Sequence, residues 1–494
     1  MRQSVPVIAR PPAASGVTEF GREALPPRPN LLTALMLFAV FLAIATSGIV
    51  FTEPAPVDVL TMGLVVALPL IGLVRVTPML VGYLAAWLLA AAAAFAAAIQ
   101  AIDVAPATTH SAISVYLYAA SFVFAAFVAH TPLRHVRLML EAYVVAALFA
   151  ATLGLIGYFD VVPGSSEIFT RYARATGAFK DPNVFGPFLV PAMIYLAHKV
   201  FTRPPLATVV PTLLLAYLGL ALIVSFSRGA WLNFAVAASI YWLLAFATTP
   251  SAVQRLRMVA LLVFGVVAAV VALAIMLQFD PVARMFEERA AVLQSYDVGP
   301  EGRFGGQSKA LDTILDNPLG IGALNFPFNF HHEDAHNVYL SMLMNAGWAG
   351  GLLYLAIVLV TLGLGLAHAL RRTPTQGLFL VAYAALVAIV VEGLIIDTDH
   401  WRHFYLLMGI VWGLMSATPQ RHAIAQPVQA HVPRRPARIT GRFVGAMPKL
   451  KAVRQPRRPA RITGRARPRL PRHIALPRRR KITAPRRPAR IDYR

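Results

Sequence analysis

The 494-residue sequence contains no cysteine, and only 14% of its residues carry a charge. The absence of cysteine excludes disulfide frameworks, thiolate nucleophiles, iron–sulfur clusters and cysteine-based zinc sites. Soluble domains are usually about 25% charged and about 45–50% apolar, whereas this chain is 57% hydrophobic and has a mean hydropathy of +0.63. These figures exclude a water-soluble globular enzyme, and they exclude a disordered or fibrous chain.

Acidic residues are scarce, because the chain has 22 of them against 45 lysines and arginines, but the imbalance is confined to one end. Residues 418–494 hold 23 basic residues and one acid, whereas residues 1–417 are balanced to within one charge. The phrase PRRPARITGR occurs at 433–442 and at 456–465, and a shortened copy lies at 485–491. A segment of proline and arginine without an apolar period cannot bury a core, so we predict a disordered tail.

Long apolar runs are abundant, and a bilayer core needs roughly 20 such residues for each helix. We predict an all-α bundle of about twelve transmembrane helices over residues 31–417, preceded by a polar segment at 1–30. The predicted spans lie near 31–51, 58–74, 80–101, 112–129, 138–159, 184–201, 206–225, 230–247, 258–278, 347–369, 377–396 and 402–417. The stretch 336–370 is too long for one span, so its glycines, beginning with Gly347, predict a short helix before the span itself.

The loops between these spans alternate in charge. Nine basic and no acidic residues lie in the loops around Arg75, Arg134, Lys199, Arg255 and Arg371, which fall on alternate sides of the span list. The positive-inside rule then predicts that both termini are cytoplasmic. The outer face receives the loops 52–57, 102–111, 160–183, 226–229, 279–336 and 397–401. The longest outer loop has room for helices of its own, and we predict one over 308–315.

The cytoplasmic position of the basic tail indicates membrane lipids as its partner, because anionic headgroups attract juxtamembrane cations. Clustered cations also suit nucleic acid, but we do not expect a nucleic acid partner. A tail that only reinforces the orientation of the chain is the structural alternative.

Three polar stretches lie in outer loops beside the membrane. The first contains Arg171, Arg174 and Lys180, the second contains Arg228, and the third contains His336. Arginine offers a planar, always-charged fork that suits phosphate oxygens. A histidine at a helix start should have a lowered pKa, so its neutral imidazole can accept a proton from an attacking hydroxyl. Guanidinium groups can stabilise a diphosphate leaving group without a metal.

These residues also have structural interpretations. Arg174 and Arg228 could be interfacial anchors whose side chains snorkel into lipid headgroups. His336 could be the neighbour of an Asp334 N-cap. Glu392, inside an apolar span, is either a functional group or a hydrogen-bonded packing residue.

Other polar residues of the outer face are less diagnostic. A metal site made from His331, His332 and Asp334 lacks a characteristic spacing, and we expect no metal. Asp397, Asp399 and His400 could form a polar outer rim. Four histidines are further candidates, either as bases or as satisfied polar residues, and they are His331, His332, His400 and His403.

Four phrases, in this order, resemble the O-antigen ligase family of bacterial polytopic membrane proteins. They are RATGAFKDPNVFG (174–186), SFSRGAWL (225–232), NPLGIGALNF (317–326) and HNVYLSMLMNAGWAGGLLYL (336–355). The family also includes O-antigen polymerases and exopolysaccharide polymerases. The resemblance covers roughly residues 165–370, and the basic tail matches nothing in it.

The resemblance implies a GT-C-like fold in the bacterial inner membrane with a large periplasmic loop at 279–336. It also implies a metal-independent, inverting glycosyl transfer at the periplasmic face, without a cofactor. The donor would be a glycan on undecaprenyl diphosphate. The acceptor would be lipid A–core in a ligase, or another lipid-linked glycan in a polymerase of lipopolysaccharide or exopolysaccharide biosynthesis.

Carried over residue by residue, the resemblance makes Arg174 and Arg228 the diphosphate-binding arginines and His336 the general base. Arg303 could add a further contact, and Arg171 is a near neighbour of Arg174. The alternative is a polytopic transporter or flippase of lipid-linked saccharides. That class typically distributes polar residues along a central pathway and often has two similar halves, whereas here the charges cluster at the outer face.

Overall fold

The computed structural model describes residues 30–290, 299 and 302–417, all of which belong to one compact unit that spans Met1–Arg421. Residues 1–29 of the predicted N-terminal segment and the whole predicted basic tail, 418–494, lie outside the described residues. The site and its surroundings are therefore described within this one unit.

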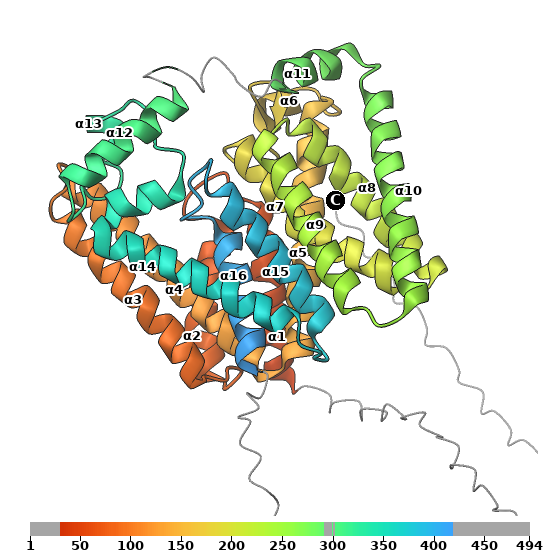
Figure 1. The fold of residues 1–494 in the computed structure, drawn as a ribbon, viewed down its shortest axis with the longest axis horizontal. Coiled ribbons are helices and arrows are strands. Elements are labelled where there is room, and N and C mark those ends of the chain that lie inside the picture. Colours follow the sequence, from red (N-terminus) through yellow and green to blue (C-terminus); the bar gives the residue numbers. More distant parts are fainter. Residues whose placement is uncertain (1–29, 291–298, 300–301, 418–494) are drawn as a thin grey trace, which may run out of the picture. The chain divides into compact units, whose positions relative to one another are not determined.

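The described residues form an all-α fold (Figure 1), to which a single two-stranded ribbon is added. Twelve helices coincide in position with the twelve predicted spans: α1 (Leu31–Ala45), α2 (Pro56–Leu70), α3 (Pro78–Ala98), α4 (Val104–His130), α5 (Pro132–Tyr158), α7 (Pro182–Thr202), α8 (Val209–Val224), α9 (Arg228–Thr248), α10 (Ala252–Met276), α14 (Val338–Ala369), α15 (Gln376–Glu392) and α16 (Arg402–Ala417). The predicted loops contain the short helices α6 (Ser165–Phe169), α11 (Asp280–Ala290), α12 (Arg303–Asp316) and α13 (Phe326–Asn329), and the strands β1 (Thr170–Arg171) and β2 (Arg174–Ala175).

Nine helices of the described part are long and apolar enough to cross a membrane, where α1 is counted with the adjoining 3-10 turn Thr46–Gly48 and α8 with the 3-10 turn Pro205–Thr208. Helices α2, α15 and α16 have 15, 17 and 16 residues, which is shorter than a typical span of roughly 20 residues. The chain is thus an all-α polytopic membrane protein, and the count of twelve spans remains a prediction.

Helix α14 is broken where the sequence predicted a break. Gly347 has φ 65° and ψ −177°, which is not helical, so a short helix over 338–346 precedes the longer one. Glycine is required there both for its positive φ and for space, because an added Cβ would lie 2.6 Å from the backbone of Leu319. The backbone amide of Trp348 also donates to the carbonyl of Pro318 at 2.9 Å. The break lets the 318–320 turn pack directly on α14.

The long loop contains the predicted amphipathic helix, and this helix is longer than expected. Helix α12 begins at Arg303, five residues before the predicted start, and ends at Asp316 just before Pro318. Its apolar face packs with Phe326 and Met344, and the indole of Trp348 donates to the carbonyl of Ile314 at 2.9 Å. The loop is therefore fixed to α14 by apolar contacts and by this hydrogen bond.

Aromatic rings and glycines hold α16 against its neighbours. Helix α16 packs between α4 and α15 (Figure 1). The ring of Tyr83 on α3 stacks on Trp412 of α16 at 4.6 Å, and Trp87 on α3 meets the ring of Tyr405 on α16 edge to face at 5.8 Å. Gly413 lies so close to α4 that an added Cβ would be 2.6 Å from the carbonyl oxygen of Ala125. Close backbone approach through small residues is the usual way in which membrane helices pack.

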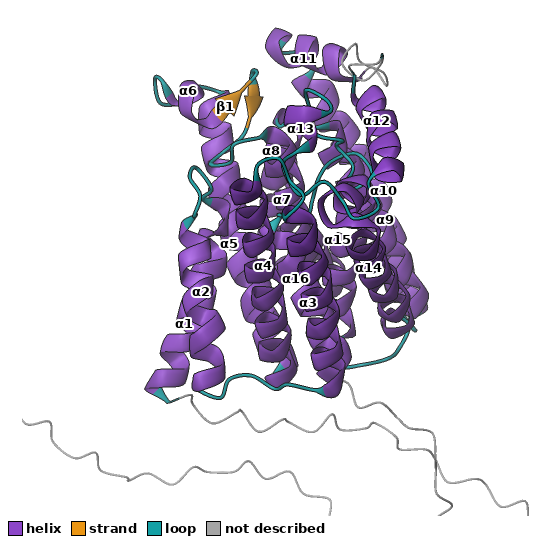
Figure 2. Cartoon of the chain, turned by 90° about the vertical axis from the view of Figure 1, so that its left-hand side faces the viewer, coloured by secondary structure: helices purple, strands orange, loops and turns teal. Residues whose placement is uncertain are grey.

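The long helices run side by side, and α6, α11, α12 and α13 gather beyond one of their ends (Figure 2). Loops that are distant in the sequence meet at this end. The amide of Val50 donates to the carbonyl of Ala178, and the amide of Ile102 donates to the side chain of Asn325. We call this the loop end, which comprises residues 46–55, 99–103, 159–181, 225–227, 277–290, 302–337 and 393–401.

Basic loops lie at the opposite end. The amide of Arg75 donates to the carbonyl of Ala126, and the guanidinium of Arg257 donates to the carbonyls of Val200 and Arg203. The predicted alternation of the loops between two ends is confirmed. Which end faces the outside of the cell remains a prediction.

We expect Gly413→Ala to destabilise the protein by about 1–3 kcal/mol, because the added methyl group would overpack the α16–α4 contact. Gly219→Ala on α8 is the matched control, since an added Cβ there meets nothing within 4 Å. Thermal unfolding in detergent measures both variants. Equal melting temperatures for the two variants would contradict the proposed close packing of α16 on α4.

Candidate functional site

A tight β-hairpin presents the first group of predicted site residues. Strands β1 and β2 pair antiparallel, with Arg171 opposite Arg174. The two turn residues, Tyr172 and Ala173, have φ values of 53° and 55°. This left-handed conformation is the one that two-residue hairpin turns require, although it is uncommon for residues other than glycine. The hairpin fixes the backbone from which the Arg174 side chain extends.

Arg174 is buried and connects the first polar stretch to the second. Its side chain is 6% exposed, its Nε donates to the carbonyl of Ser225 at 2.9 Å, and its Nη2 donates to Oδ1 of Asn183 at 2.8 Å. The hydroxyl of Ser227 donates to the same Asn183 oxygen at 2.9 Å. A guanidinium held in this way does not extend into lipid headgroups, so the snorkelling alternative is wrong for Arg174.

The other two cations of the first stretch lie elsewhere. Nη1 of Arg171 donates to the carbonyl of Lys180 at 3.0 Å. Nζ of Lys180 lies 3.6 Å from a carboxylate oxygen of Glu53, and both side chains are more than half exposed. Such a surface pair contributes only about 0–1 kcal/mol. Lys180 is therefore directed toward the loop between α1 and α2, away from the partners of Arg174.

Arg228 is the first residue of α9 and is half-buried. Ser227 caps the helix, because its hydroxyl accepts from the amide of Ala230 at 3.3 Å. The next residue, Gly229, lies directly against α15, where an added Cβ would be 2.9 Å from Oε1 of Glu392. The position of Arg228 therefore depends on the contact between α9 and the end of α15.

Glu392 forms this contact from the last position of α15. It is 1% exposed, and Oε2 accepts a hydrogen bond from Nδ2 of Asn233 at 2.7 Å. Glu392 is thus hydrogen-bonded, as its packing interpretation predicted. It holds the first turn of α9 in place.

The third polar stretch, which contains His336, is bound to Gly393, the residue that follows Glu392. The amide of Val338 donates to the carbonyl of Gly393 at 2.9 Å. Asn337 caps α14, because its side chain accepts from the amides of Tyr339 and Leu340. The suggestion that Asp334 is the N-cap is therefore wrong. The amide side chain of Asn337 fills that role because it lies directly before the helix.

His336 precedes this cap and has φ 47°, an uncommon conformation that turns the chain into α14. Its Nε2 lies 3.4 Å from a carboxylate oxygen of Glu333. Burial lowers the pKa of His336, and the positive charge of Arg303 lowers it further, whereas Glu333 opposes the change. The predicted direction of the shift is confirmed, and its largest cause is burial, which the sequence did not reveal. Neutral imidazole is favoured.

The second and third polar stretches, which contain Arg228 and His336, therefore both meet the C-terminal end of α15. Glu392 contacts the turn that begins with Arg228, and Gly393 binds the backbone two residues after His336. Arg174 joins the same region through Ser225. Arg303 is near enough to His336 for its charge to lower the pKa of the histidine, whereas its suggested contact with the diphosphate stays a prediction.

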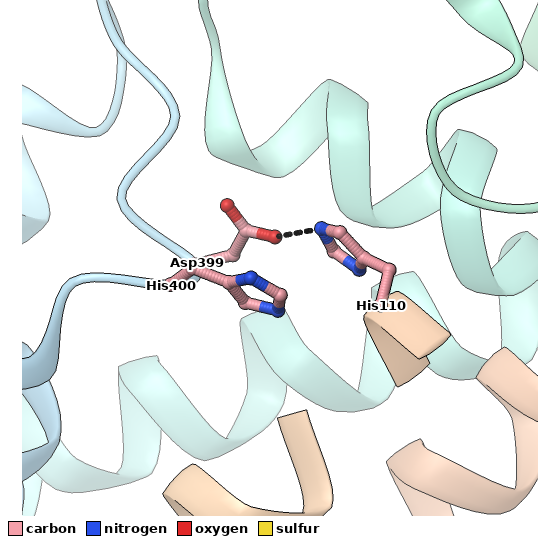
Figure 3. Close-up of side chains that lie close together, drawn as sticks. All are labelled: His110, Asp399 and His400. Atoms are coloured by element: carbon pink, nitrogen blue, oxygen red, sulfur yellow. Dashed lines mark ion pairs between the residues drawn. The ribbon is translucent and has the colours of Figure 1, made fainter. Parts of the chain in front are cut away.

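A cluster with metal-ligand chemistry lies beside this region (Figure 3). Nε2 of His110 is 3.5 Å from Oδ2 of Asp399, and the rings of His110 and His400 stack at 3.8 Å. Within the described residues these three form the one group whose potential ligand atoms all lie within 4.8 Å of one another. Burial lowers the pKa of His400 to about 4, and its Nε2 already bonds the hydroxyl of Ser114. The metal site weighed from the sequence was made of His331, His332 and Asp334, and these three residues do not form such a group in the described part of the chain.

Sequence reasoning missed several polar residues that assemble this end. Asp58 on α2 forms a bidentate ion pair with Arg402 on α16, with distances of 2.6 and 2.7 Å. Asp58 also accepts from the amide of Ala55 at 2.8 Å and so caps its own helix. The signal that could have revealed this pair is the presence of an acid and an arginine at the ends of predicted spans, because a charge there is costly without a partner.

A cavity of about 280 Å³ lies at the loop end among α1, α2, α4, α7 and α16. Its charged lining residues are Glu53, Lys180, Asp181, Asp397, Asp399 and Arg402. Burial and the neighbouring Asp399 carboxylate raise the pKa of Asp397 to about 7, while the Ser341 hydroxyl, at 2.5 Å, opposes this rise. The lining does not include Arg174, Arg228 or His336.

Fold and site together define a class: a polytopic helical membrane protein whose buried cations, carboxylates and histidines are concentrated at one end of the bundle. Residues 213–355 match the family model for O-antigen ligase. The match includes Arg228, Arg303 and His336. It confirms the resemblance over this part of the chain and supports a membrane enzyme that transfers glycans, of the ligase or polymerase kind. A comparison with curated proteins finds no match.

We expect Asp58→Ala to destabilise the protein by about 2–3 kcal/mol. This is less than the roughly 3–5 kcal/mol of a fully buried pair, because a quarter of the Arg402 side chain is exposed. Lys180→Ala breaks only a solvent-exposed pair and should change stability by at most about 1 kcal/mol. Thermal unfolding compares the two. An Asp58→Ala protein as stable as Lys180→Ala would show that the bidentate pair does not hold α2 to α16.

Proposed function

We propose that the chain transfers a glycan from undecaprenyl diphosphate to an acceptor hydroxyl at the outer face of the bacterial plasma membrane. The single observation that carries this proposal is the junction at the end of α15, where Glu392 contacts the turn of Arg228 and Gly393 binds the start of α14 beside His336. The matched family segment contains both the arginine and the histidine that this junction connects.

In this proposal Arg174 and Arg228 bind the diphosphate. Fixed guanidinium groups offer paired N–H donors to phosphate oxygens and stabilise the charge that develops as the leaving group departs. Arg174 is held by Ser225 and Asn183, so its orientation is set before the donor binds. Because these groups supply positive charge, the transfer needs no metal.

His336 acts as the general base. Its neutral imidazole accepts the proton of the acceptor hydroxyl as that oxygen attacks the anomeric carbon, and the bond from that carbon to the diphosphate breaks. Attack from the side opposite the leaving group inverts the configuration. Glu333, at 3.4 Å, is placed to stabilise the imidazolium that forms.

The acceptor separates two versions of the same chemistry. A ligase would transfer the glycan to lipid A–core, and a polymerase would transfer it to another lipid-linked glycan. A transporter of lipid-linked saccharides is the competing function. It requires neither a general base nor a bidentate arginine, so the variants below distinguish it.

We expect His336→Ala to lower the rate of glycan transfer about 10²–10⁴-fold, which is the usual contribution of a general base. Arg228→Lys should also lose transfer, because lysine keeps the positive charge but lacks the planar guanidinium fork. His331→Ala, at a neighbouring histidine outside the proposed site, is the control and should keep wild-type transfer. The assay uses purified protein, lipid-linked donor and acceptor in vesicles. Full transfer by His336→Ala would remove it as the base.

The pH dependence of transfer tests the same residue. Since Arg303 lowers the pKa of His336, Arg303→Gln should raise this pKa, and transfer should then be lost at a higher pH as the solution is acidified. Glu333→Gln should have the opposite effect, because Glu333 raises the pKa. The measurement is the rate against pH for the three proteins. Acid limbs that coincide would show that His336 does not control the rate.

A further inference from the structure

The cavity at the loop end has no role in the mechanism above, and its lining indicates a ligand. Its rim carries charged side chains, and its walls include the aromatic rings of Tyr116, Phe179 and Trp401. Ligand sites in proteins combine such apolar walls with a few polar groups, and they have volumes of roughly 300–1,000 Å³. The volume here, about 280 Å³, suits a small unit such as a sugar ring.

A buried histidine in the cavity wall carries a polar atom without a partner. His403 is 4% exposed, and no described atom forms a hydrogen bond with its Nε2. Its ring stacks on Trp401 at 5.0 Å and meets the edge of Phe188 at 5.7 Å. Buried polar atoms usually have a partner, and because His403 also lines the cavity, a hydrogen-bonding ligand there can supply one.

The charges of the rim disfavour an anion. Four carboxylates line the cavity against two cations, and both cations are paired, Lys180 with Glu53 and Arg402 with Asp58. A phosphate would therefore meet mainly like charges. Carboxylate oxygens accept hydrogen bonds from hydroxyl groups. An isoprenoid chain would leave the His403 nitrogen without a partner, which costs free energy.

We propose that this cavity binds an uncharged, hydroxyl-rich sugar unit of the acceptor. This inference rests on the proposed function, because it places the acceptor beside the proposed base. Asp397 lines the cavity and bonds Ser341 in the first turn of α14, which begins two residues after His336. In this arrangement the sugar packs on Trp401, one hydroxyl bonds Nε2 of His403, and the rim carboxylates accept from others.

The test measures binding of a labelled saccharide to the purified full-length chain by equilibrium dialysis. The probe is the oligosaccharide released by mild acid from the source cell's own surface glycolipids. His403→Phe keeps the stacked ring but removes the nitrogen, and we expect it to weaken binding about fivefold to tenfold. His368→Phe is the matched control. His368 is equally buried, its Nε2 is likewise unpaired, and it packs on Phe379, but it does not line the cavity.

Competitors separate the kinds of ligand. Inorganic diphosphate and farnesol, added in excess, should leave saccharide binding unchanged. Displacement by either compound, or equal affinity in the two histidine variants, would overturn the proposal. If His403→Phe does not yield folded protein, Asp399→Asn at the rim provides the same comparison, and unchanged affinity in that variant would equally overturn it.

The outcome is separable from that of the proposed function. If the protein binds the saccharide in this way but transfers no glycan in vesicles, the transfer proposal fails and the sugar site stands. If transfer occurs while His403→Phe alters neither the affinity nor the KM for acceptor, the sugar site fails alone.

Discussion

A buried carboxylate at the end of one helix is the contact on which this loop end depends. Glu392 is removed from solvent, yet it accepts from Asn233 and contacts Gly229, so it fixes the helix start that carries Arg228. The next residue, Gly393, accepts a hydrogen bond from the amide of Val338 at the start of α14. Removing the carboxylate would leave a buried amide donor unpaired, at a cost of about 1–3 kcal/mol. The positions of the proposed phosphate-binding arginine and the proposed base are coupled through these two residues.

The helical framework could be predicted from the sequence because membrane helices are specified by local composition. Apolar runs located the twelve helices that coincide with predicted spans, and Gly347 located the break in α14, since only glycine fits its positive φ so close to Leu319. Helix α12 was predicted too short because its first turn, around Arg303 to Gly306, lacks the apolar period that marks the rest of the helix.

The candidate site was only partly predictable, because its partners are distant in the chain. Asp58 and Arg402 are 344 positions apart, and nothing local relates them. The burial of Arg174 could not be foreseen either, since its partners Ser225 and Asn183 are unremarkable loop and helix residues. His110 was overlooked because nothing in the sequence relates the predicted loop 102–111 to Asp399, and only the fold brings the two residues together. Motif order identified the residue types, and tertiary contacts decided which of them meet.

The proposed transfer requires that this loop end faces the outside of the cell, where the lipid-linked glycan and its acceptor would be. The absence of cysteine makes a direct measurement possible. Glu167→Cys places a thiol at an exposed position of the loop end, and Arg372→Cys places one at an exposed position of the opposite end. In intact spheroplasts, a membrane-impermeant maleimide should label Glu167→Cys, and it should label Arg372→Cys only after permeabilisation. The reverse pattern would contradict the account.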